Sequence, residues 1–124
     1  MECPFCKIIA DKKEIVLENE LAVAFYDSFP VSNGHTLIIP KRHVETYFDL
    51  SPEEMSAIFD LSQKMRDLLE KRYKPDGFNV GFNVGECGGQ SVMHCHMHVI
   101  PRYRGDQENP RGGIRKIVKN KTQY

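Results

Sequence analysis

Short runs of aliphatic, β-branched and aromatic residues occupy the first third of the chain and predict strands. These runs cover residues 15–18, 21–26 and 36–39. Only two polar residues separate the first pair, which is typical of a hairpin. We expect Pro40 to end the third strand, because proline has no N–H to donate to a neighbouring strand.

The middle of the chain carries the pattern of one long helix. Ser51 offers a hydroxyl at the N-cap, Pro52 suits the first helical position, and Glu54 completes a capping box. Apolar residues then recur at steps of three and four, which predicts one face packed on the core. That face is expected to comprise Met55, Ile58, Phe59, Ser62, Met65 and Leu69. Residues 74–77 (Lys-Pro-Asp-Gly) are expected to end the helix.

Two more strand patterns follow the helix. Residues 78–84 alternate apolar side chains with asparagine and glycine, and residues 92–100 form a second run after a glycine-rich loop. Five strands, several joined by short turns, together with one long helix indicate an α+β fold with an antiparallel sheet. From Arg102 onward we expect irregular structure.

Composition and charge narrow the class of protein. The chain has 124 residues, 40% of them hydrophobic and 27% charged, so one domain over residues 1–124 is expected. Seventeen basic and seventeen acidic residues give a net charge of +0, which argues against a nucleic acid or anionic lipid partner. Without a long apolar run or a signal-peptide pattern, we expect a cytoplasmic protein and no membrane partner.

The charges are nevertheless unevenly distributed. Residues 102–124 hold seven basic and two acidic residues, which leaves 10 basic and 15 acidic residues in 1–101. The chain therefore divides into an acidic body and a basic C-terminal tail. A solvated tail is the ordinary interpretation, but Arg111 and Arg115 flank two glycines, and such guanidinium groups can clasp phosphate oxygens.

Three histidines alternate along the last predicted strand. On a strand, His94, His96 and His98 share one face while Cys95 points to the other and is expected to be a small buried hydrophobe. A row of imidazoles where a core belongs favours a functional site. These residues alone leave two functions open: zinc binding, or attack by one imidazole on phosphorus.

A Cys-x-x-Cys motif near the N-terminus is a second candidate site. Cys3 and Cys6 can form a redox pair or half of a zinc site. The βαβ context of a thioredoxin-like redox motif is missing, which favours a metal.

The run His-Cys-His-Met-His-Val-Ile at residues 94–100 resembles the signature of the histidine-triad (HIT) family of nucleotide hydrolases and transferases. Residues 34–43 and 83–91 resemble two further blocks of that family, and the similarity covers most of residues 3–105. The resemblance implies a HIT-like fold, in which a five-stranded antiparallel sheet accompanies one long helix and a short N-terminal helix. It also implies a homodimer that binds a small nucleotide substrate.

The resemblance further implies a hydrolase that cleaves at the α-phosphate of a nucleoside phosphate derivative, either a dinucleoside polyphosphate or a phosphoramidate. His96 is the implied nucleophile, and it needs a neutral ring whose N–H is held by an acceptor near His94. His98 and His35 would donate to phosphate oxygens, and Ser91 would donate on the leaving-group side. The implied substrate contacts are Asp27, Asn83, Gly89, Gln90, Arg111 and Arg115.

Two alternatives to this hydrolase remain open. A nucleotidyltransferase or phosphorylase would use an acceptor other than water, and a non-catalytic module would bind nucleotide and rely on zinc for stability. Within the family, the subset with Cys-x-x-Cys implies structural zinc held by Cys3, Cys6, His43 and His94. No organic cofactor is expected.

Overall fold

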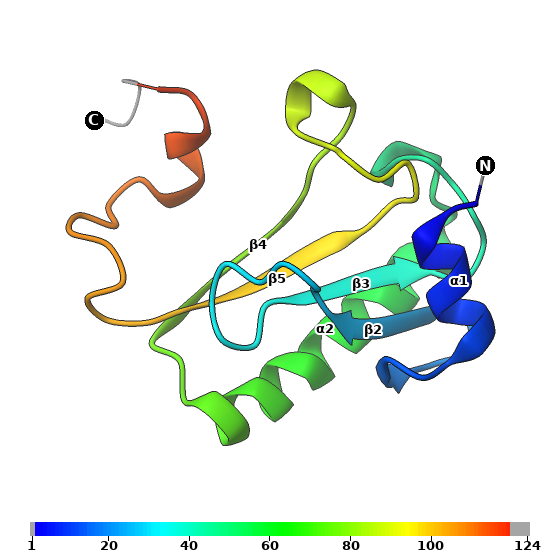
Figure 1. The fold of residues 1–124 in the computed structure, drawn as a ribbon, viewed down its shortest axis with the longest axis horizontal. Helices are drawn as coiled ribbons and strands as arrows, with labels where there is room; N and C mark the ends of the chain where they lie inside the picture. Colours follow the sequence, from blue (N-terminus) through cyan, green and yellow to red (C-terminus); the bar gives the residue numbers. More distant parts are fainter. Residues whose placement is uncertain (1, 120–124) are drawn as a thin grey trace.

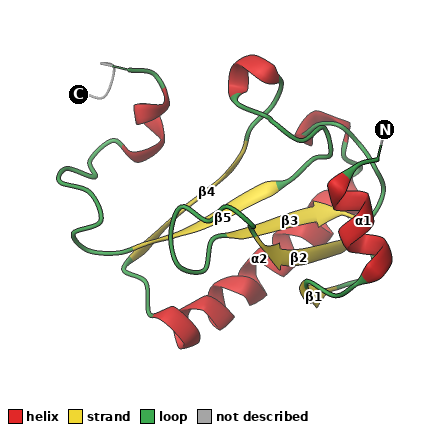
Figure 2. Cartoon of the chain, viewed as in Figure 1, coloured by secondary structure: helices red, strands yellow, loops and turns green. Residues whose placement is uncertain are grey.

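The structure, a computed structural model, describes residues 2–119 and is centred on a five-stranded sheet (Figures 1 and 2). The strands are β1 (Ile15–Glu18), β2 (Ala22–Tyr26), β3 (Thr36–Pro40), β4 (Gly77–Phe82) and β5 (Met97–Arg102). They lie in the order β1-β2-β3-β5-β4, and every neighbouring pair is antiparallel. The predicted α+β fold with an antiparallel sheet is confirmed.

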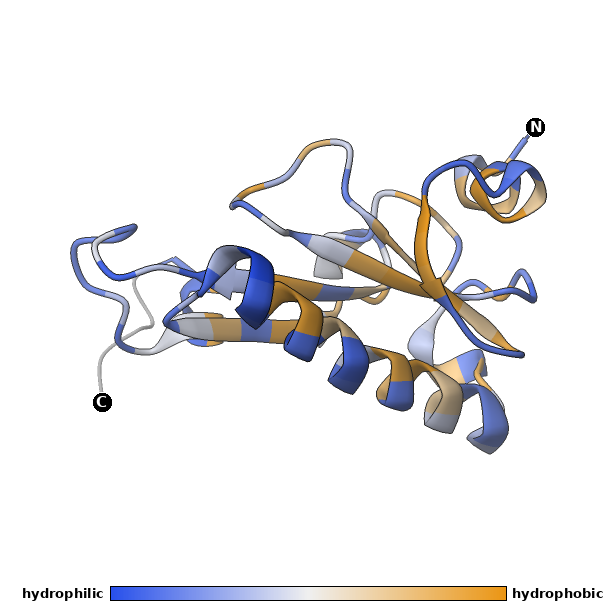
Figure 3. Ribbon diagram, turned by 90° about the horizontal axis from the view of Figure 1, so that it is seen from below, coloured by the Kyte–Doolittle hydropathy of each residue, from blue (hydrophilic) through white to orange (hydrophobic). Residues whose placement is uncertain are grey.

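Each face of the sheet is covered by one helix, with α1 (Pro4–Asp11) on one side and α2 (Pro52–Tyr73) on the other (Figure 3). Alternating side chains of β2 and β3 separate into two apolar clusters accordingly. The α2 side holds Ala22, Ala24, Ile38, Ile58, Leu61, Met65, Leu69 and Val99. The α1 side holds Phe5, Val23, Phe25, Leu37 and Ile39. The short N-terminal helix thus has its own part of the core to cover.

Helix α2 begins and ends as its sequence predicts. Ser51 Oγ accepts from the Glu54 backbone N–H at 3.1 Å, and Glu54 Oε1 accepts from the Ser51 N–H at 2.9 Å, which completes the capping box. At the other end, Lys74 adopts φ +52° in the left-handed region, and its N–H bonds to Glu70 O.

Part of the buried face of α2 differs from the predicted one by a single position along the helix. Met55 and Phe59 are 39% and 59% exposed, whereas Leu61, absent from the expected face, is buried. Ile58, Leu61, Met65 and Leu69 pack on the sheet instead. Adjacent residues are separated by about 100° around a helix axis, so an apolar residue one position away from the buried row turns toward solvent.

The last strand begins later in the structure than the sequence pattern predicts. β5 begins at Met97 rather than Val92, and its pairing with β3 ends where Ile38 faces Met97. Before that point the chain leaves the sheet, with the Cys95 N–H bonded to Val44 O at 2.7 Å. His94 and His96 consequently lie outside the strand, and the expected single face shared by three histidines is wrong.

As expected, the tail follows β5 along a largely irregular path (Figure 1). It also contains a short 3-10 helix, Gly113–Ile117, that the sequence pattern does not predict. Residues 120–124 of the predicted tail lie outside the described part of the chain. Among the described helices, none combines the length and the apolar character that crossing a bilayer requires.

Candidate functional site

Three histidines gather where β3 and β5 lie side by side, and a fourth, His94, lies next to them in the chain. His35 directly precedes β3, His98 is the second residue of β5, and His94 and His96 come from the segment before β5. The ring of His98 lies 5.2 Å from that of His35 and 5.0 Å from that of His96, measured between centroids. His94 turns away to a separate cluster with His43, which lies 4.8 Å from it.

The buried ring of His96 is held in one tautomer by the main chain. Its Nδ1 lies 2.8 Å from the carbonyl oxygen of His94. A carbonyl can only accept, so Nδ1 carries the proton and Nε2 keeps a free lone pair. This is the acceptor near His94 that the sequence leads one to expect, and it prepares Nε2 for attack on an electrophile.

A second chain of hydrogen bonds fixes His35 and His98. The Val31 backbone N–H donates to His35 Nδ1 at 3.1 Å, which places the His35 proton on Nε2. That nitrogen lies 3.0 Å from His98 Nδ1, so it donates there. The His98 proton is then on Nε2, a buried atom without a hydrogen-bond partner among the described residues. A buried donor without a partner suits an oxygen of a bound substrate.

Asp27 completes this chain beside the histidines. One carboxylate oxygen lies 3.5 Å from His35 Nε2, and the other accepts from the Phe29 N–H at 2.9 Å. Asp27, His35 and His98 are close enough to hold a metal ion. A metal needs the lone pair of His35 Nε2, but the Val31 N–H occupies the Nδ1 lone pair and keeps the proton on Nε2. The group is therefore arranged for hydrogen bonding.

Burial keeps the two histidines neutral. Desolvation lowers the pKa of His98 to about 4, helped by the positive charge that His96 and His35 carry when protonated. Desolvation also lowers the pKa of His35, against an opposing effect of the Asp27 carboxylate. At neutral pH both rings thus act as neutral donors and acceptors.

The glycine-rich loop is held from inside by Gln90, which is 3% exposed. Its Oε1 accepts from the Gly85 N–H at 2.9 Å, and its Nε2 donates to Glu45 O and Val92 O. The amide is therefore occupied by main-chain groups, so Gln90 shapes the loop. Gly89 needs its residue type, because φ is +92° there.

Three other predicted contacts lie exposed on or beside that loop. Asn83, Gly89 and Ser91 are all accessible to solvent. A Cβ placed on Gly89 would lie 3.8 Å from the Asn83 side chain, so the loop passes close to the end of β4. The Asn83 side chain and the Ser91 hydroxyl therefore remain available to a substrate, whereas the Gly89 N–H donates to Glu86 O at 3.0 Å.

An apolar cavity of about 330 Å³ adjoins the His35 and His98 pair. Its apolar walls are Val31, Val80, Phe82, Ile100, Ile114 and Ile117. The last two come from the tail, whose Arg111 and Arg115 do not line the cavity. The structure therefore brings apolar tail residues to the site, while the predicted arginines lie elsewhere on the tail.

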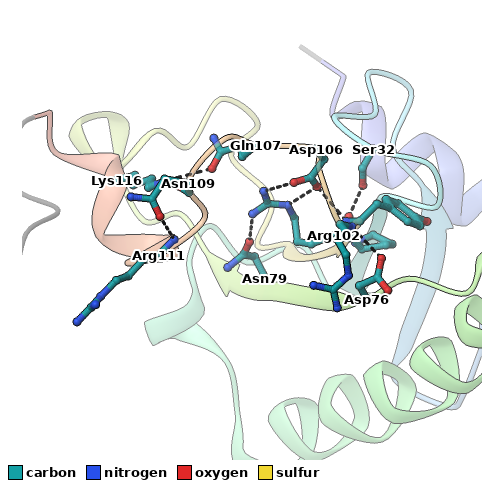
Figure 4. Close-up of polar contacts among 12 residues, drawn as sticks. Ser32, Asp76, Asn79, Arg102, Asp106, Gln107, Asn109, Arg111 and Lys116 are labelled. Atoms are coloured by element: carbon teal, nitrogen blue, oxygen red, sulfur yellow. Dashed lines mark hydrogen bonds and ion pairs between the residues drawn. The ribbon is translucent and has the colours of Figure 1, made fainter.

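The start of the tail is fixed by a polar cluster (Figure 4). Arg102 binds both oxygens of Asp106 at 2.8 Å and donates to Asn79 Oδ1 at 2.7 Å. Figure 4 shows the Arg111 side chain pointing away from this cluster. The sequence predicts neither the role of Asn79 nor that of the Val31 backbone, because an ordinary strand asparagine and a main-chain N–H belong to no motif.

The four predicted metal ligands meet in one cluster. Cys6 Sγ lies 3.3 Å from His43 Nδ1 and 3.6 Å from His94 Nδ1. Cys3 Sγ lies 3.5 Å from His94 Nδ1, and the two Nδ1 atoms are 3.1 Å apart. Tetrahedral zinc with bonds of 2.0–2.3 Å separates its ligands by about 3.3–3.8 Å. The four separations, 3.1–3.6 Å, lie within about 0.2 Å of this range, so two thiols and two imidazoles at these positions fit a closed zinc site.

The tautomer of His94 agrees with this fit. Its Nε2 lies 2.8 Å from the Pro40 carbonyl oxygen, so the proton is on Nε2 and the Nδ1 lone pair faces the cysteines. A backbone acceptor behind a metal-binding histidine is the usual way to orient the ring. His94 is fully buried, and desolvation lowers its pKa, which keeps the lone pair available.

Comparison with known proteins places this geometry in a family. The family model described as the HIT domain matches residues 10–105. A HIT-like protein of Mycoplasma pneumoniae is 45% identical over 103 residues, which cover 82% of this chain and 72% of that protein. A crystal structure of a HIT family protein from Bacillus anthracis is 44% identical, with a TM-score of 0.78, and the match covers 82% of this chain and 74% of that one.

Other matches have more specific descriptions. A zinc-bound histidine triad family protein from Mycobacterium smegmatis is 32% identical, has a TM-score of 0.78, and the match covers 88% of this chain and 81% of that one. An asymmetrical bis(5'-nucleosyl)-tetraphosphatase of Schizosaccharomyces pombe and an adenylylsulfatase of Arabidopsis thaliana are each 34% identical. The matches cover 75% and 85% of this chain but only 51% and 54% of those proteins. With the fold, the histidine arrangement and these similarities in agreement, the chain belongs to the HIT domain family.

Proposed function

We propose that this protein is a nucleotidyl hydrolase that cleaves at the α-phosphate of a nucleoside phosphate derivative. The observation that carries the proposal is the tautomer of His96, whose Nδ1–H is held by the His94 carbonyl and whose Nε2 lone pair is free. A neutral imidazole in this state is a competent nucleophile toward phosphorus.

The reaction has two steps. In the first, the lone pair of His96 Nε2 forms a bond to the α-phosphorus, and the bond from phosphorus to the leaving group breaks with its electron pair. The ring becomes a cation that donates more strongly to the His94 carbonyl. In the second step, water attacks phosphorus and releases its proton to the solvent, the N–P bond breaks, and its electron pair returns to Nε2. The products are a nucleoside monophosphate and free His96.

The neighbouring histidines are placed to stabilise the negative charge that develops on the phosphate oxygens. His98 Nε2–H is a preorganised donor toward a phosphate oxygen, where negative charge shifts during transfer. His35 donates to His98 rather than into open space, so we assign it to fixing the His98 tautomer. Asp27 stands next in this chain and offers a carboxylate to the ribose hydroxyls.

The remaining substrate contacts are assigned by position. Asn83 and Ser91 are exposed, and Asn83 lines the cavity beside His35 and His98, so an amide and a hydroxyl are assigned to phosphate oxygens or the leaving group. The Gly89 N–H donates to Glu86 O, so a contact from Gly89 stays a prediction. Gln90 contributes by holding the loop. Arg111 and Arg115 stay predictions.

Two relatives support hydrolysis at phosphorus. One is a bis(5'-nucleosyl)-tetraphosphatase and the other an adenylylsulfatase, and this chain spans about half the length of each. Both names describe cleavage of a nucleotide next to a phosphate, with different leaving groups. They favour the chemistry at the α-phosphate and leave the choice of leaving group to experiment.

We propose further that Cys3, Cys6, His43 and His94 hold a structural zinc ion. Their spacing fits tetrahedral coordination by two thiolates and two imidazoles, a closed set that leaves no position for substrate. When bound, zinc would cross-link the N-terminus to the segment before β5. The homodimer, the single domain over residues 1–124 and the cytoplasmic location stay predictions.

The decisive experiment is the His96→Ala variant, assayed with a panel of dinucleoside polyphosphates and nucleoside phosphoramidates. The wild-type protein should release a nucleoside monophosphate, and rapid quenching with mass spectrometry should show a nucleotidyl adduct on His96. The variant should lose turnover by at least about 10³-fold while nucleotide affinity and melting temperature stay near wild type.

Each other result has a clear meaning. Turnover that survives in His96→Ala contradicts the nucleophile assignment. Product that carries phosphate or another acceptor in place of water identifies a phosphorylase or transferase. Nucleotide binding by the wild type with neither adduct nor product across the panel indicates a non-catalytic module.

A further inference from the structure

The loop between β2 and β3 carries the main-chain group that orients His35, yet little of this loop is buried. Residues 28–31 and Asn33 are exposed, and the side chains of Phe29 and Val31 are 86% and 72% exposed. Apolar packing therefore does little to fix Val31, whose N–H donates to His35 Nδ1 at 3.1 Å. Polar contacts have to keep this N–H in place.

Two hydroxyl groups attach the loop to the turn that follows β5. Ser32 Oγ donates to the Pro101 carbonyl oxygen at 2.7 Å (Figure 4), and Tyr103 Oη donates to the Asn33 carbonyl oxygen at 2.7 Å. The Ser32 carbonyl oxygen in turn accepts from the His35 N–H at 3.1 Å. Both attachments therefore lie on the short segment between the orienting N–H and His35.

We infer that Ser32 and Tyr103 are positioning residues that act on the histidines through the 28–34 loop. Held by these two hydroxyls, the loop keeps the protons of His35 and His98 on their Nε2 atoms. The inference rests on the proposed function, in which His98 Nε2–H donates to a phosphate oxygen.

The first step of the argument concerns the two ways in which the histidine pair can share its protons. In the arrangement described above, His35 Nε2–H donates to His98 Nδ1 at 3.0 Å, and His98 keeps a proton on Nε2. In the alternative arrangement both protons lie on the Nδ1 atoms, and His98 Nδ1–H donates to His35 Nε2 instead. The bond between the rings is present in both. Only the first arrangement gives His98 a donor for phosphate, because its Nε2 is a lone pair in the second.

The second step is that the Val31 N–H selects between these arrangements. In the alternative, His35 Nδ1 would carry a proton only 3.1 Å from the Val31 nitrogen. Two donors would then face each other, and the Val31 N–H would lose its acceptor, which is unfavourable. If the loop moves away, His35 Nδ1–H can donate to water and this penalty disappears. The proton on His98 Nε2 therefore depends on the position of the loop.

The third step concerns the turn that provides the attachment points. Arg102 binds both carboxylate oxygens of Asp106 at 2.8 Å and donates to Asn79 Oδ1 of β4 at 2.7 Å. The Tyr103 N–H also donates to Asp106, at 3.0 Å. A bidentate pair of guanidinium and carboxylate fixes the geometry of both groups. The turn is thus fastened to the sheet and gives the loop rigid points of attachment.

The test compares two double variants, Ser32→Ala/Tyr103→Phe and Ser62→Ala/Tyr26→Phe. Each removes one serine and one tyrosine hydroxyl that is hydrogen-bonded, but Ser62 bonds within α2 and Tyr26 bonds to α2. For the loop variant we expect kcat to fall about tenfold with KM within about threefold of wild type. The control should keep kcat within about twofold at a temperature where both proteins are folded. Should the loop variant fail to fold, Tyr103→Phe alone keeps the ring and should lower kcat about threefold.

A second readout observes the histidines and the loop without substrate. In the wild type at pH 7, long-range ¹H–¹⁵N NMR should show His35 and His98 as Nε2–H tautomers, with the Val31 amide protected from exchange. In the loop variant, the Nδ1–H form of both rings should reach at least about a tenth of the population, and Val31 exchange should accelerate at least about fivefold. Amides of the β2–β3 ladder should keep their exchange rates, since a general loss of stability would accelerate them too. If the wild type has no turnover, the proposed function fails while this readout still tests the loop.

Three outcomes would overturn the inference. An increase in KM at unchanged kcat would make the loop a substrate contact. An equal loss of kcat in the control variant would mean that the loss of any such hydroxyl has the same effect. Nε2–H tautomers and Val31 protection that both persist in the loop variant would show that the loop is held without Ser32 and Tyr103.

Discussion

Single main-chain atoms decide what the histidines of this protein can do. The His94 carbonyl oxygen keeps the proton of His96 on Nδ1, and the Val31 N–H keeps the proton of His35 on Nε2. The carbonyl contact leaves His96 with a free Nε2 lone pair. The Val31 contact makes His35 Nε2 donate to His98 Nδ1, so the His98 proton lies on Nε2. At this scale the chemistry open to the histidines is set by backbone geometry around side chains that the sequence identifies.

The sequence motif therefore identifies the histidines of the site correctly but does not predict how their side chains are arranged. Alternation predicts that His94, His96 and His98 share a strand face, yet only His98 lies in β5. The ring of His94 bonds to Pro40 O and the ring of His96 to His94 O. Such contacts between a ring and the main chain draw the segment out of the sheet, and no periodicity in the sequence reports them.

The low pKa of His98 predicts a pH-dependent stability. Its pKa is about 4 in the folded protein, against 6.5 for an ordinary histidine, so the unfolded chain binds more protons between these values and stability falls as the pH falls from 6.5 toward 4. We expect His98 to contribute about 2 kcal/mol of this loss, after allowance for partial exposure. Urea denaturation at pH 7 and pH 4.5 measures it.

The comparison for this prediction is His98→Asn, with chelator in every sample so that metal release does not differ. Each protein is compared with itself at pH 7. The variant should lose less stability at pH 4.5 than the wild type, and an equal loss in both would contradict a depressed His98 pKa.

At the scale of elements, local rules predict where α2 starts and tertiary packing decides which face it buries. The capping box of Ser51 and Glu54 uses only neighbouring residues, so the sequence contains all of it. The buried face depends on how the helix lies on β2 and β3, which the sequence pattern does not contain. Phe59 consequently ends up 59% exposed in spite of its apolar side chain.

Glu54 also connects α2 to the segment after β3. Its side chain is 6% exposed and binds Arg42 through both oxygens, at 2.9 and 2.7 Å. Hydrogen bonds from Arg42, followed by those from Ser51, lower its pKa to about 2. A paired buried carboxylate of this kind leaves its partner and the helix N-terminus unsatisfied when it is removed.

We therefore predict that Glu54→Ala lowers the free energy of unfolding by about 2–3 kcal/mol. Glu53→Ala is a matched control, because it removes the same charge from the same helical turn at an exposed site, and it should cost less than about 0.5 kcal/mol. Denaturant unfolding at pH 7 gives both values. Equal losses would show that the helix dipole, and not the Arg42 contact, is responsible.

At the scale of the whole molecule, the metal cluster joins three distant parts of the chain. Cys3 and Cys6 begin α1, His43 follows β3, and His94 precedes β5. The sequence predicts these four ligands only through the family resemblance, since residues 91 positions apart give no local signal of contact. The opposite holds for the tail, where charge suggests arginines at the site and the fold brings isoleucines to the cavity.

Zinc should accordingly stabilise the whole fold. A ligand at 100 times its dissociation constant adds about 2.7 kcal/mol to the folded state, which for a chain of 124 residues corresponds to a melting temperature about 10 °C higher. Scanning calorimetry with and without zinc should show this rise in the wild type and lose it in Cys3→Ser. Cys87→Ser is the matched control, because Cys87 is an exposed thiol outside the cluster. It should keep the full rise, and an equal loss there, or a zinc-independent wild type, would contradict the site.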